Sequence, residues 1–242
     1  MNRSVDPFWT TFLYNQTVFT ERYIMVETRS DLPETVRIIR HAMLDHKMSM
    51  LRDKETNTDT FLNLLTEIAT IMACEMTQDL PTTLKPVTTP MEAMEAPFIA
   101  TKKLCLAPVL RAGLGMAPGF KHIIPRAKTA HISLKRDEET FEAKRGDTPS
   151  FPDKLSERLV LLLDPMCATG GTAVEAISIL KENGARNIMF ANIICAKEGL
   201  VKVYEHHPDV QIYTCAVDRE LNESAYILPG LGDAGDRAFG TV

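Results

Sequence analysis

The chain has 242 residues, of which 45% are hydrophobic and 24% are charged, and its net charge is −5. This composition is typical of a soluble globular protein, and no apolar run approaches the ~20 residues of a membrane-spanning helix. The negative charge argues against a general attraction for nucleic acid. The five cysteines form no C-x-x-C pair, so neither a disulfide framework nor a zinc site is indicated. We therefore expect a cytoplasmic protein that binds neither nucleic acid nor membranes.

The first 98 residues are predicted to form a peripheral arm up to residue 30, then two helices, then a proline-rich strand or loop. Residues 1–30 carry scattered aromatic side chains that suit either an arm packed on a neighbour or a loosely docked terminus. A helix is predicted to begin near Asp31, and a second helix is predicted from Asp59 to Thr77 on a single apolar stripe. Residues 79–98 contain four prolines, which favours an edge strand or a loop.

From residue 99 to residue 217, apolar strands alternate with helices. Continuous apolar strands joined by crossover helices indicate an α/β fold with a mostly parallel sheet flanked by helices. The long polar stretch from Arg136 to Glu157 indicates a hairpin or flap over the edge of the sheet. The strands are predicted at 104–110, 129–134, 158–163, 187–195 and 210–217, and the helices at 173–183 and 198–206.

The loops after these strands carry the polar residues of a candidate site. In such sheets, ligands bind beyond the carboxyl ends of the strands. Asp164 follows one strand, and the segment Ala168–Thr172 (ATGGT) then opens a helix whose free N–H groups favour a phosphate. Two glycines alone could mark only a tight turn. Because neither G-x-x-x-x-G-K nor G-x-G-x-x-G is present, nucleoside triphosphate and dinucleotide sites lose their usual support. Arg111, directly after another strand, suits anion binding better than a surface salt bridge.

Several segments in the same order resemble the uracil phosphoribosyltransferases of the type I phosphoribosyltransferase family. They are HKMSMLRD, VLRAGLGM, LKRDEET, DPMCATGGT and YILPGLGDAGDRAFGT. Pro165 stands where many relatives have a second acid, and Pro118-Gly119 leaves the start of the following helix open. The resemblance implies a single type I phosphoribosyltransferase domain over 31–242. Within it, 31–98 would be a helical N-terminal part, 99–217 the core that binds phosphoribosyl pyrophosphate (PRPP), and 218–242 a uracil-binding hood loop.

The resemblance also implies an activity and its residues. The 5-phosphoribosyl group of PRPP would be transferred to N1 of uracil, giving UMP and pyrophosphate in pyrimidine salvage. Mg²⁺ would be held through PRPP and water without a direct protein ligand. The implied catalytic residues are Asp164, Arg111 and Asp233, and a cis non-proline peptide bond is expected near Arg111. The implied PRPP-binding residues are Arg111, Arg136, Asp164, Pro165, Met166, Cys167, Ala168, Thr169, Gly170, Gly171, Thr172 and Asp233. The implied uracil-binding residues are Tyr226, Ile227, Gly232, Asp233 and Ala234.

The glycine-rich loop at 226–237 predicts the base that is bound. Backbone groups of Gly232–Ala234 can complement the acceptor, donor, acceptor edge of uracil, whereas cytosine would leave buried groups unpaired. Asp236 and Arg237 suit a structural ion pair with each other. A phosphoribosyltransferase for another base, or a regulatory protein that senses PRPP or nucleotides on the same fold, stays open as an alternative. The resemblance further implies a homo-oligomer, either a dimer or a tetramer; some relatives are activated by GTP, and no residue here proves or excludes that effector.

Overall fold

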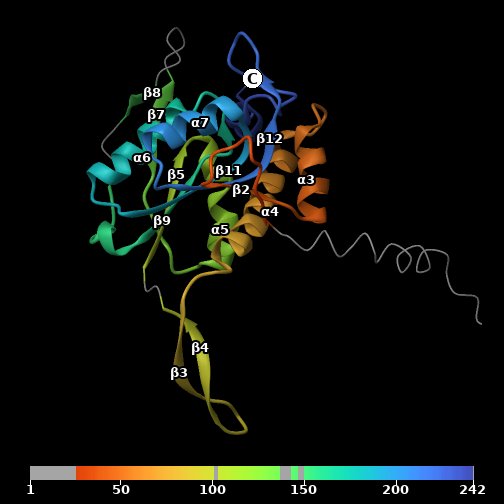
Figure 1. Cartoon of the computed structure of the whole chain (residues 1–242). Helices are drawn as coiled ribbons and strands as arrows, with labels where there is room; N and C mark the ends of the chain where they lie inside the picture. Colours follow the sequence, from red (N-terminus) through yellow and green to blue (C-terminus); the bar gives the residue numbers. More distant parts are fainter. Residues whose placement is uncertain (1–25, 101–102, 137–142, 147–149, 242) are drawn as a thin grey trace, which may run out of the picture.

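A ten-stranded, mostly parallel sheet forms the centre of the molecule (Figure 1). The structure is a computed structural model that describes residues 26–100, 103–136, 143–146 and 150–241. The order of the strands is β1-β2-β12-β11-β9-β5-β7-β8, with β6 paired to β5 and β10 paired to β11. All pairs from β2 to β7 along this order are parallel, and only the outer pairs β1–β2 and β7–β8 are antiparallel. The strands are β1 Val26–Glu27, β2 Val36–Ile39, β5 Leu104–Leu110, β6 Lys128–Thr129, β7 Ile132–Arg136, β8 Ala143–Arg145, β9 Leu159–Leu163, β10 Met166–Cys167, β11 Asn187–Ala196 and β12 Gln211–Asp218.

The central strands are apolar along their whole length because both of their faces are covered. All five residues of β9 are buried, which explains the uninterrupted run of leucine and valine in this strand. Leu163, at the end of β9, pairs with Pro108 of β5 on one side and with Ala191 of β11 on the other. The loops that leave β5 and β9 therefore start side by side at the carboxyl edge of the sheet.

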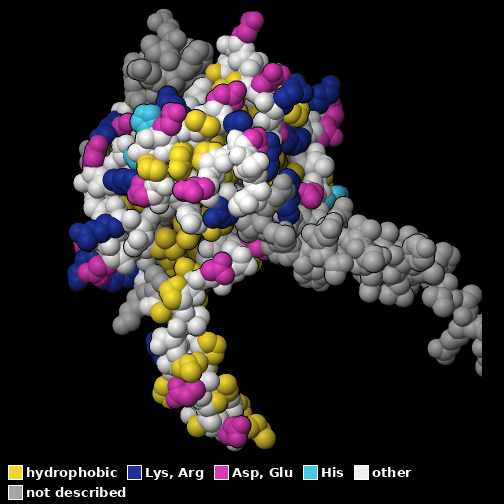
Figure 2. All heavy atoms as spheres, in the orientation of Figure 1, with side chains coloured by type: hydrophobic (Ala, Val, Ile, Leu, Met, Phe, Trp, Pro, Cys, Tyr) yellow, Lys and Arg dark blue, Asp and Glu magenta, His cyan; other side chains and the backbone are white. Residues whose placement is uncertain are grey.

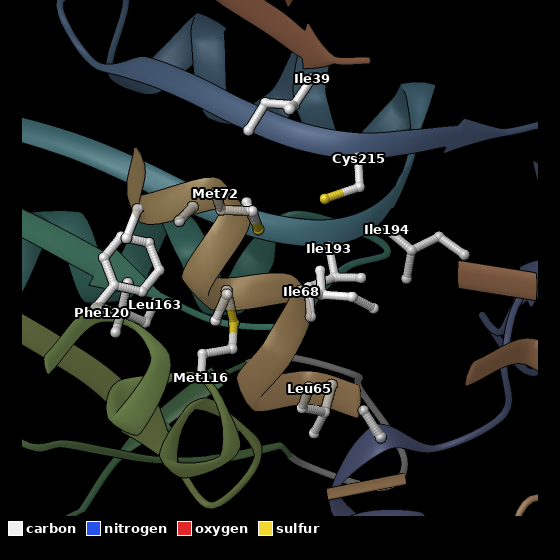
Figure 3. Close-up of a cluster of buried hydrophobic side chains, with 14 of the residues drawn as sticks. Ile39, Leu65, Ile68, Met72, Met116, Phe120, Leu163, Ile193, Ile194 and Cys215 are labelled. Atoms are coloured by element: carbon white, nitrogen blue, oxygen red, sulfur yellow. The ribbon is translucent and has the colours of Figure 1, made fainter. Parts of the chain in front are cut away.

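Helices cover the two faces of the sheet and enclose two hydrophobic clusters. On one face, the helix α4 packs Leu65, Ile68 and Met72 against Ile193 and other residues of the sheet and of α5 (Figure 3). On the other face, α6 and α7 cover the second cluster. The predicted α/β architecture is thus confirmed. The helices are α3 Ala42–Arg52, α4 Thr58–Thr77, α5 Ala117–Ile123, α6 Gly171–Glu182, α7 Lys197–His206 and α8 Ala234–Phe239, with short 3-10 helices η1 Ala112–Gly115 and η2 Leu155–Glu157.

The predicted helix beginning near Asp31 is wrong. Val36–Ile39 is strand β2, parallel to β12 with Val36 opposite Ile212, and the helix α3 begins only at Ala42. The sequence of β2 is Val-Arg-Ile-Ile, and its three β-branched residues favour a strand. Val36 and Ile39 are buried in different clusters on opposite faces of the sheet, which a helical stripe could not achieve.

A long hairpin projects from the body of the molecule below α5 (Figure 1). It consists of β3 Thr82–Thr88 and β4 Ala93–Ile99, which pair with each other antiparallel and form a separate two-stranded sheet. Its proline-containing strands lie outside the central sheet, in accordance with the edge-strand prediction for 79–98. Figure 2 shows hydrophobic side chains along this projection.

The remaining segments complete the carboxyl side of the sheet. Strands β7 and β8 form an antiparallel pair where the flap was predicted, and Arg145 at its end bonds both carboxylate oxygens of Glu182 at 2.6 and 2.8 Å. Residues 137–142 and 147–149 of the predicted flap, and residues 1–25 of the predicted arm, lie outside the described residues. The short strands β13 Glu220–Leu221 and β14 Ile227–Leu228 precede α8. Within the described ranges, no helix has the length and apolarity to cross a membrane.

Candidate active site

The loop between β9 and α6 has the form of an anion-binding site. Gly170 is the N-cap of α6 with a φ of +78°, and the helix begins at Gly171, two residues earlier than predicted. A Cβ atom on Gly170 would lie 2.5 Å from the carbonyl oxygen of Gly199, so this position requires glycine. The hydroxyl groups of Thr169 and Thr172 make no hydrogen bond within the described part of the chain and are half-buried. Free N–H groups and two hydroxyls therefore lie in one short loop at the N-terminus of α6.

Asp164 lies between β9 and this loop and is 8% exposed. Its Oδ1 accepts a hydrogen bond from the backbone N–H of Met166 at 3.4 Å. Burial raises the pKa of Asp164 from an ordinary 3.8 to about 7; the Met166 N–H opposes this rise, and the neighbouring charge of Asp233 adds to it. Within the described residues, Asp164 has no ion pair, and a buried carboxyl in that state is costly to a fold and typical of active sites.

The loop after β5 places Arg111 beside the Asp164 loop. The peptide bond Leu110–Arg111 is cis, which confirms the hypothesis of a cis non-proline bond near Arg111. Residues Ala112–Gly115 then form η1. A Cβ atom on Gly113 would lie 2.3 Å from the carbonyl oxygen of Leu163, so only glycine allows this loop to sit against the end of β9. The helix α5 begins at Ala117, and Pro118 occupies its first turn, where proline is tolerated.

Asp233 approaches the same place from the C-terminal segment. It is the N-cap of α8, and its Oδ1 accepts from the N–H of Asp236 at 2.9 Å. Its negative charge adds to the rise in the pKa of Asp164, through repulsion between like charges. A bound cation would relieve this repulsion. Within the described ranges, no group of three or more His, Cys, Asp or Glu side chains could hold a metal ion.

The predicted uracil-binding residues surround Asp233 in the sequence but differ in exposure. Ile227 is buried in β14, Ala234 is fully buried at the start of α8, and Gly232 has a φ of +83°. Tyr226 is 45% exposed. Ile227 and Ala234 therefore lie in the interior, whereas the Tyr226 side chain lies partly in solvent.

Two arginines attach this C-terminal loop to the end of α3. Arg52 forms a bidentate ion pair with Asp218 at 2.7 Å for both bonds, and it also donates to the carbonyl oxygen of Gly230 at 2.9 Å. Arg237 donates to the carbonyl oxygens of Leu51 and Leu231 at 3.0 and 2.7 Å. The segment HKMSMLRD thus holds the loop in place. Sequence reasoning matched this segment without giving Arg52 or Asp218 a role, because their partners are distant in the chain.

The predicted structural pair of Asp236 with Arg237 is wrong. Among the described residues, Asp236 instead pairs with Arg111 at 3.2 Å, whereas Arg237 is committed to backbone carbonyl groups and lies 4.4 Å from the Phe61 ring. Asp236 and Arg237 are neighbours on a short helix, so their side chains point in different directions. Arg136 was predicted to follow a strand at 129–134, whereas it is the last residue of β7, at the carboxyl edge of the sheet; its side chain lies outside the described part of the structure.

Comparison with known proteins agrees with this geometry. The sequence profile of the uracil phosphoribosyltransferase family matches residues 38–241. The chain belongs to the uracil phosphoribosyltransferase family. Named members of the family include the uracil phosphoribosyltransferases of Bacillus licheniformis, 48% identical, and Agrobacterium fabrum, 46% identical, each over 206 residues that cover 85% of this chain and 98% of the relative.

Solved structures support the same fold for this uracil phosphoribosyltransferase family member. The protein AQ2163 from Aquifex aeolicus is similar with a TM-score of 0.80 and 31% identity, covering 84% of this chain and 97% of that one. The adenine phosphoribosyltransferase of Trypanosoma brucei, solved with AMP, pyrophosphate and ribose-5-phosphate, has a TM-score of 0.56 at 11% identity, covering 86% of this chain and 92% of that one. The second likeness concerns the fold alone, and it is the type I phosphoribosyltransferase fold that the sequence predicted.

Proposed function

We propose that this protein transfers the 5-phosphoribosyl group of PRPP to N1 of uracil, giving UMP and pyrophosphate for pyrimidine salvage. One observation carries the proposal beyond family membership: three segments distant in the chain meet at the carboxyl edge of the sheet. These are the Arg111 loop, the loop of Asp164 to Thr172, and the Asp233 end of α8. A phosphorylated sugar with a pyrophosphate leaving group needs an anion site at each end and a polar group between them, and in our proposal these segments provide them.

Each part of PRPP has a matching group in this arrangement. The 5′-phosphate fits the N-terminus of α6, where the hydroxyls of Thr169 and Thr172 are available. The ribose hydroxyls fit Asp164, whose carboxylate oxygens accept hydrogen bonds. The pyrophosphate fits the guanidinium of Arg111 and, in our proposal, that of Arg136. The residues between Asp164 and Thr169 give the loop its shape through their backbone.

The chemistry requires positioning and electrostatic stabilisation more than a covalent catalyst. As N1 of uracil replaces pyrophosphate at C1′, positive charge develops on the ribose ring, and an ionised Asp164 near the ribose would stabilise that charge. Because the pKa of Asp164 is about 7 in the free protein, ligand hydroxyls would favour its ionised form on binding. Mg²⁺, which we propose as the cofactor, neutralises the leaving pyrophosphate when it is bound. Asp233, beside Asp164, would hold it through water.

Backbone groups would select the base. Gly232–Ala234 can offer N–H and C=O groups at close range because Gly232 carries no side chain. The buried Ile227 would provide a main-chain contact, and the ring of Tyr226 could cover the base from the solvent side. A cytosine in this place would set donors against donors, which costs several powers of ten in discrimination when the groups are buried.

The experiment that tests the proposal measures UMP formation from labelled uracil, PRPP and Mg²⁺, with cytosine, hypoxanthine and orotate as parallel substrates. UMP formation with uracil alone is expected, and Asp164→Asn should abolish it. Turnover of another base would indicate a different specificity on the same fold. Binding of PRPP or UMP without any turnover would indicate a regulatory protein instead.

The hairpin β3–β4 supports a homo-oligomer. Leu84, Met91, Met94, Phe98 and Ile99 are between 43% and 91% exposed on it, and a free two-stranded hairpin is marginally stable in water. We propose that a second copy of the chain covers these side chains. Replacing residues 82–99 by a short glycine-serine loop should convert the oligomer to monomers in size-exclusion chromatography with light scattering. An unchanged mass would overturn this assignment of the interface.

The cellular setting follows from the same chemistry. We propose a cytoplasmic location, which is supported by five free cysteines in the structure and by substrates that are nucleotide precursors. Activation by GTP stays a prediction, and titrating GTP into the UMP-forming assay tests it.

A further inference from the structure

The guanidinium of Arg111 is held by the C-terminal end of the chain. Its Nη2 lies 3.2 Å from Oδ1 of Asp236 and 3.5 Å from Oγ1 of Thr241. The Thr241 hydroxyl also donates to Oδ1 of Asp236, which closes a ring of three side chains. The Phe239 ring lies 6.0 Å from the Arg111 guanidinium carbon. Residues 236–241 therefore form one wall of the place that Arg111 occupies.

This wall is continuous with the Asp233 end of the site. Asp233 caps α8 and accepts a hydrogen bond from the N–H of Asp236, so both carboxylates are fixed by one turn of helix. Gly235 lies between these two carboxylates in the sequence, and a Cβ atom added to it would be 4.0 Å from the Cβ of Ala112. The Arg111 loop and the start of α8 are thus in contact, and a change at Asp236 acts on Arg111 directly.

We infer that Asp236 is a positioning residue for PRPP and pyrophosphate, because it orients Arg111 toward the leaving group before the substrate arrives. This inference rests on the proposed function. Arg111 is exposed at 56% of its side chain, and a free arginine has many rotamers to lose on binding. The Asp236 contact uses Nη2 alone. Within the described residues, Nε and Nη1 have no partner, so a fork of donors stays available to a phosphate.

The charge of Asp236 could also have the opposite effect on anion binding. The carboxylate of Asp236 is negative, so it could weaken the binding of an anion beside it. However, Asp236 itself is 33% exposed and its charge is already opposed by Arg111, which limits its effect on a third group. Orientation of the guanidinium is therefore the stronger effect, and removal of the carboxylate should weaken pyrophosphate binding.

The test compares Asp236→Asn, Asp236→Ala and Thr241→Val with the unaltered protein. We expect Asp236→Asn to raise KM for PRPP and the inhibition constant of pyrophosphate about fivefold, and Asp236→Ala to raise them further. KM for uracil and the dissociation constant of UMP should change less than about twofold, because UMP carries no pyrophosphate. Asp209→Asn is the matched control. Asp209 pairs with Lys181 at 2.6 Å. It lies just before β12, at the amino ends of the parallel strands and so away from the site.

The outcomes separate this inference from its alternatives. Unchanged or tighter binding of PRPP and pyrophosphate in Asp236→Asn would overturn it, as would an equal rise in the constants for uracil and UMP, which indicates general damage to the C-terminal loop. If Asp236→Ala fails to fold, as judged by its melting temperature, Asp236→Asn and Thr241→Val carry the test. A lack of UMP formation by the unaltered protein would refute the proposed function instead, and that result is distinct from any of these.

Discussion

Replacing Asp164 with asparagine should stabilise the ligand-free protein while abolishing its activity. A carboxyl whose pKa is raised to about 7 in the folded state, from 3.8 when unfolded, holds its proton more tightly in the folded protein. Between these two values, the unfolded chain has released the proton and the folded protein has not, so the free energy of unfolding falls as pH rises. Above pH 7 the whole penalty is present. At about 1.4 kcal/mol per pH unit it amounts to roughly 4 kcal/mol.

Urea unfolding of both proteins at pH 5 and pH 8, without ligand and with a chelator, measures this effect. The stability advantage of Asp164→Asn should grow by roughly 3 kcal/mol between the two pH values, because the folded carboxyl loses its proton only near pH 7. Asparagine keeps the shape of the side chain and still accepts from the Met166 N–H. Its lack of charge removes the penalty and also the proposed stabilisation of the ribose.

Glu182→Gln provides a control in which the pKa of the replaced carboxyl is lowered by folding instead of raised. The hydrogen bonds from Arg145 lower the pKa of Glu182, so its contribution to stability is present above the unfolded pKa and is lost as pH falls. This variant should gain no stability at pH 8. A stability difference between Asp164→Asn and the unaltered protein that is independent of pH, or that shrinks as pH rises, would refute the assignment of a buried, high-pKa carboxyl to Asp164.

Three further predictions follow from single positions. Gly170→Ala should lower the free energy of unfolding by about 2 kcal/mol and weaken PRPP binding at least tenfold, because a Cβ there meets backbone at 2.5 Å and φ is +78°. Gly171→Ala is the stability control, since the nearest atom to its Cβ would be 3.8 Å away, and equal losses of stability in both variants would contradict this reasoning. Native protein should react with a maleimide at Cys74 alone among its five cysteines, since the other four are buried; mass spectrometry after digestion would expose a second rapidly labelled site. Burial lowers the pKa of His207, so on acidification the unfolded chain takes up a proton before the folded one does, and the free energy of unfolding should fall below about pH 6.5. In urea titrations between pH 7.5 and 5, His207→Asn should make this fall less steep. An equally steep fall in the variant would show that another group is responsible.

The α/β core could be predicted from sequence because its strands are fully apolar and its helices have clear ends. The strand at 104–110 has the predicted bounds, and the helix predicted at Asp59–Thr77 begins one residue earlier, at Thr58, after the Asn57 cap. The position of Asp164 after a buried strand likewise placed it at the carboxyl edge. These signals are local, and each needs only a window of about ten residues.

The features that sequence reasoning missed depend on contacts between distant residues. Val36–Ile39 becomes a strand because β12 offers it a partner, and that partner is nowhere near it in the chain. Asp236 was assigned to its neighbour Arg237, whereas its partner Arg111 lies 125 residues earlier. A single sequence carries no signal for such pairings, and only the geometry of the folded sheet brings them together.

The place of β2 in the sheet has a consequence for how the chain folds during synthesis. Val36 pairs with Ile212, so a nascent chain of 200 residues still lacks the strand on which β2 must be laid. Until β12 has been made, the backbone N–H and C=O groups at that edge of β11 are unpaired and can bind other chains. The central sheet therefore cannot be completed until residues 211–218 have left the ribosome, and β2 depends for its lasting structure on a strand made more than 170 residues later.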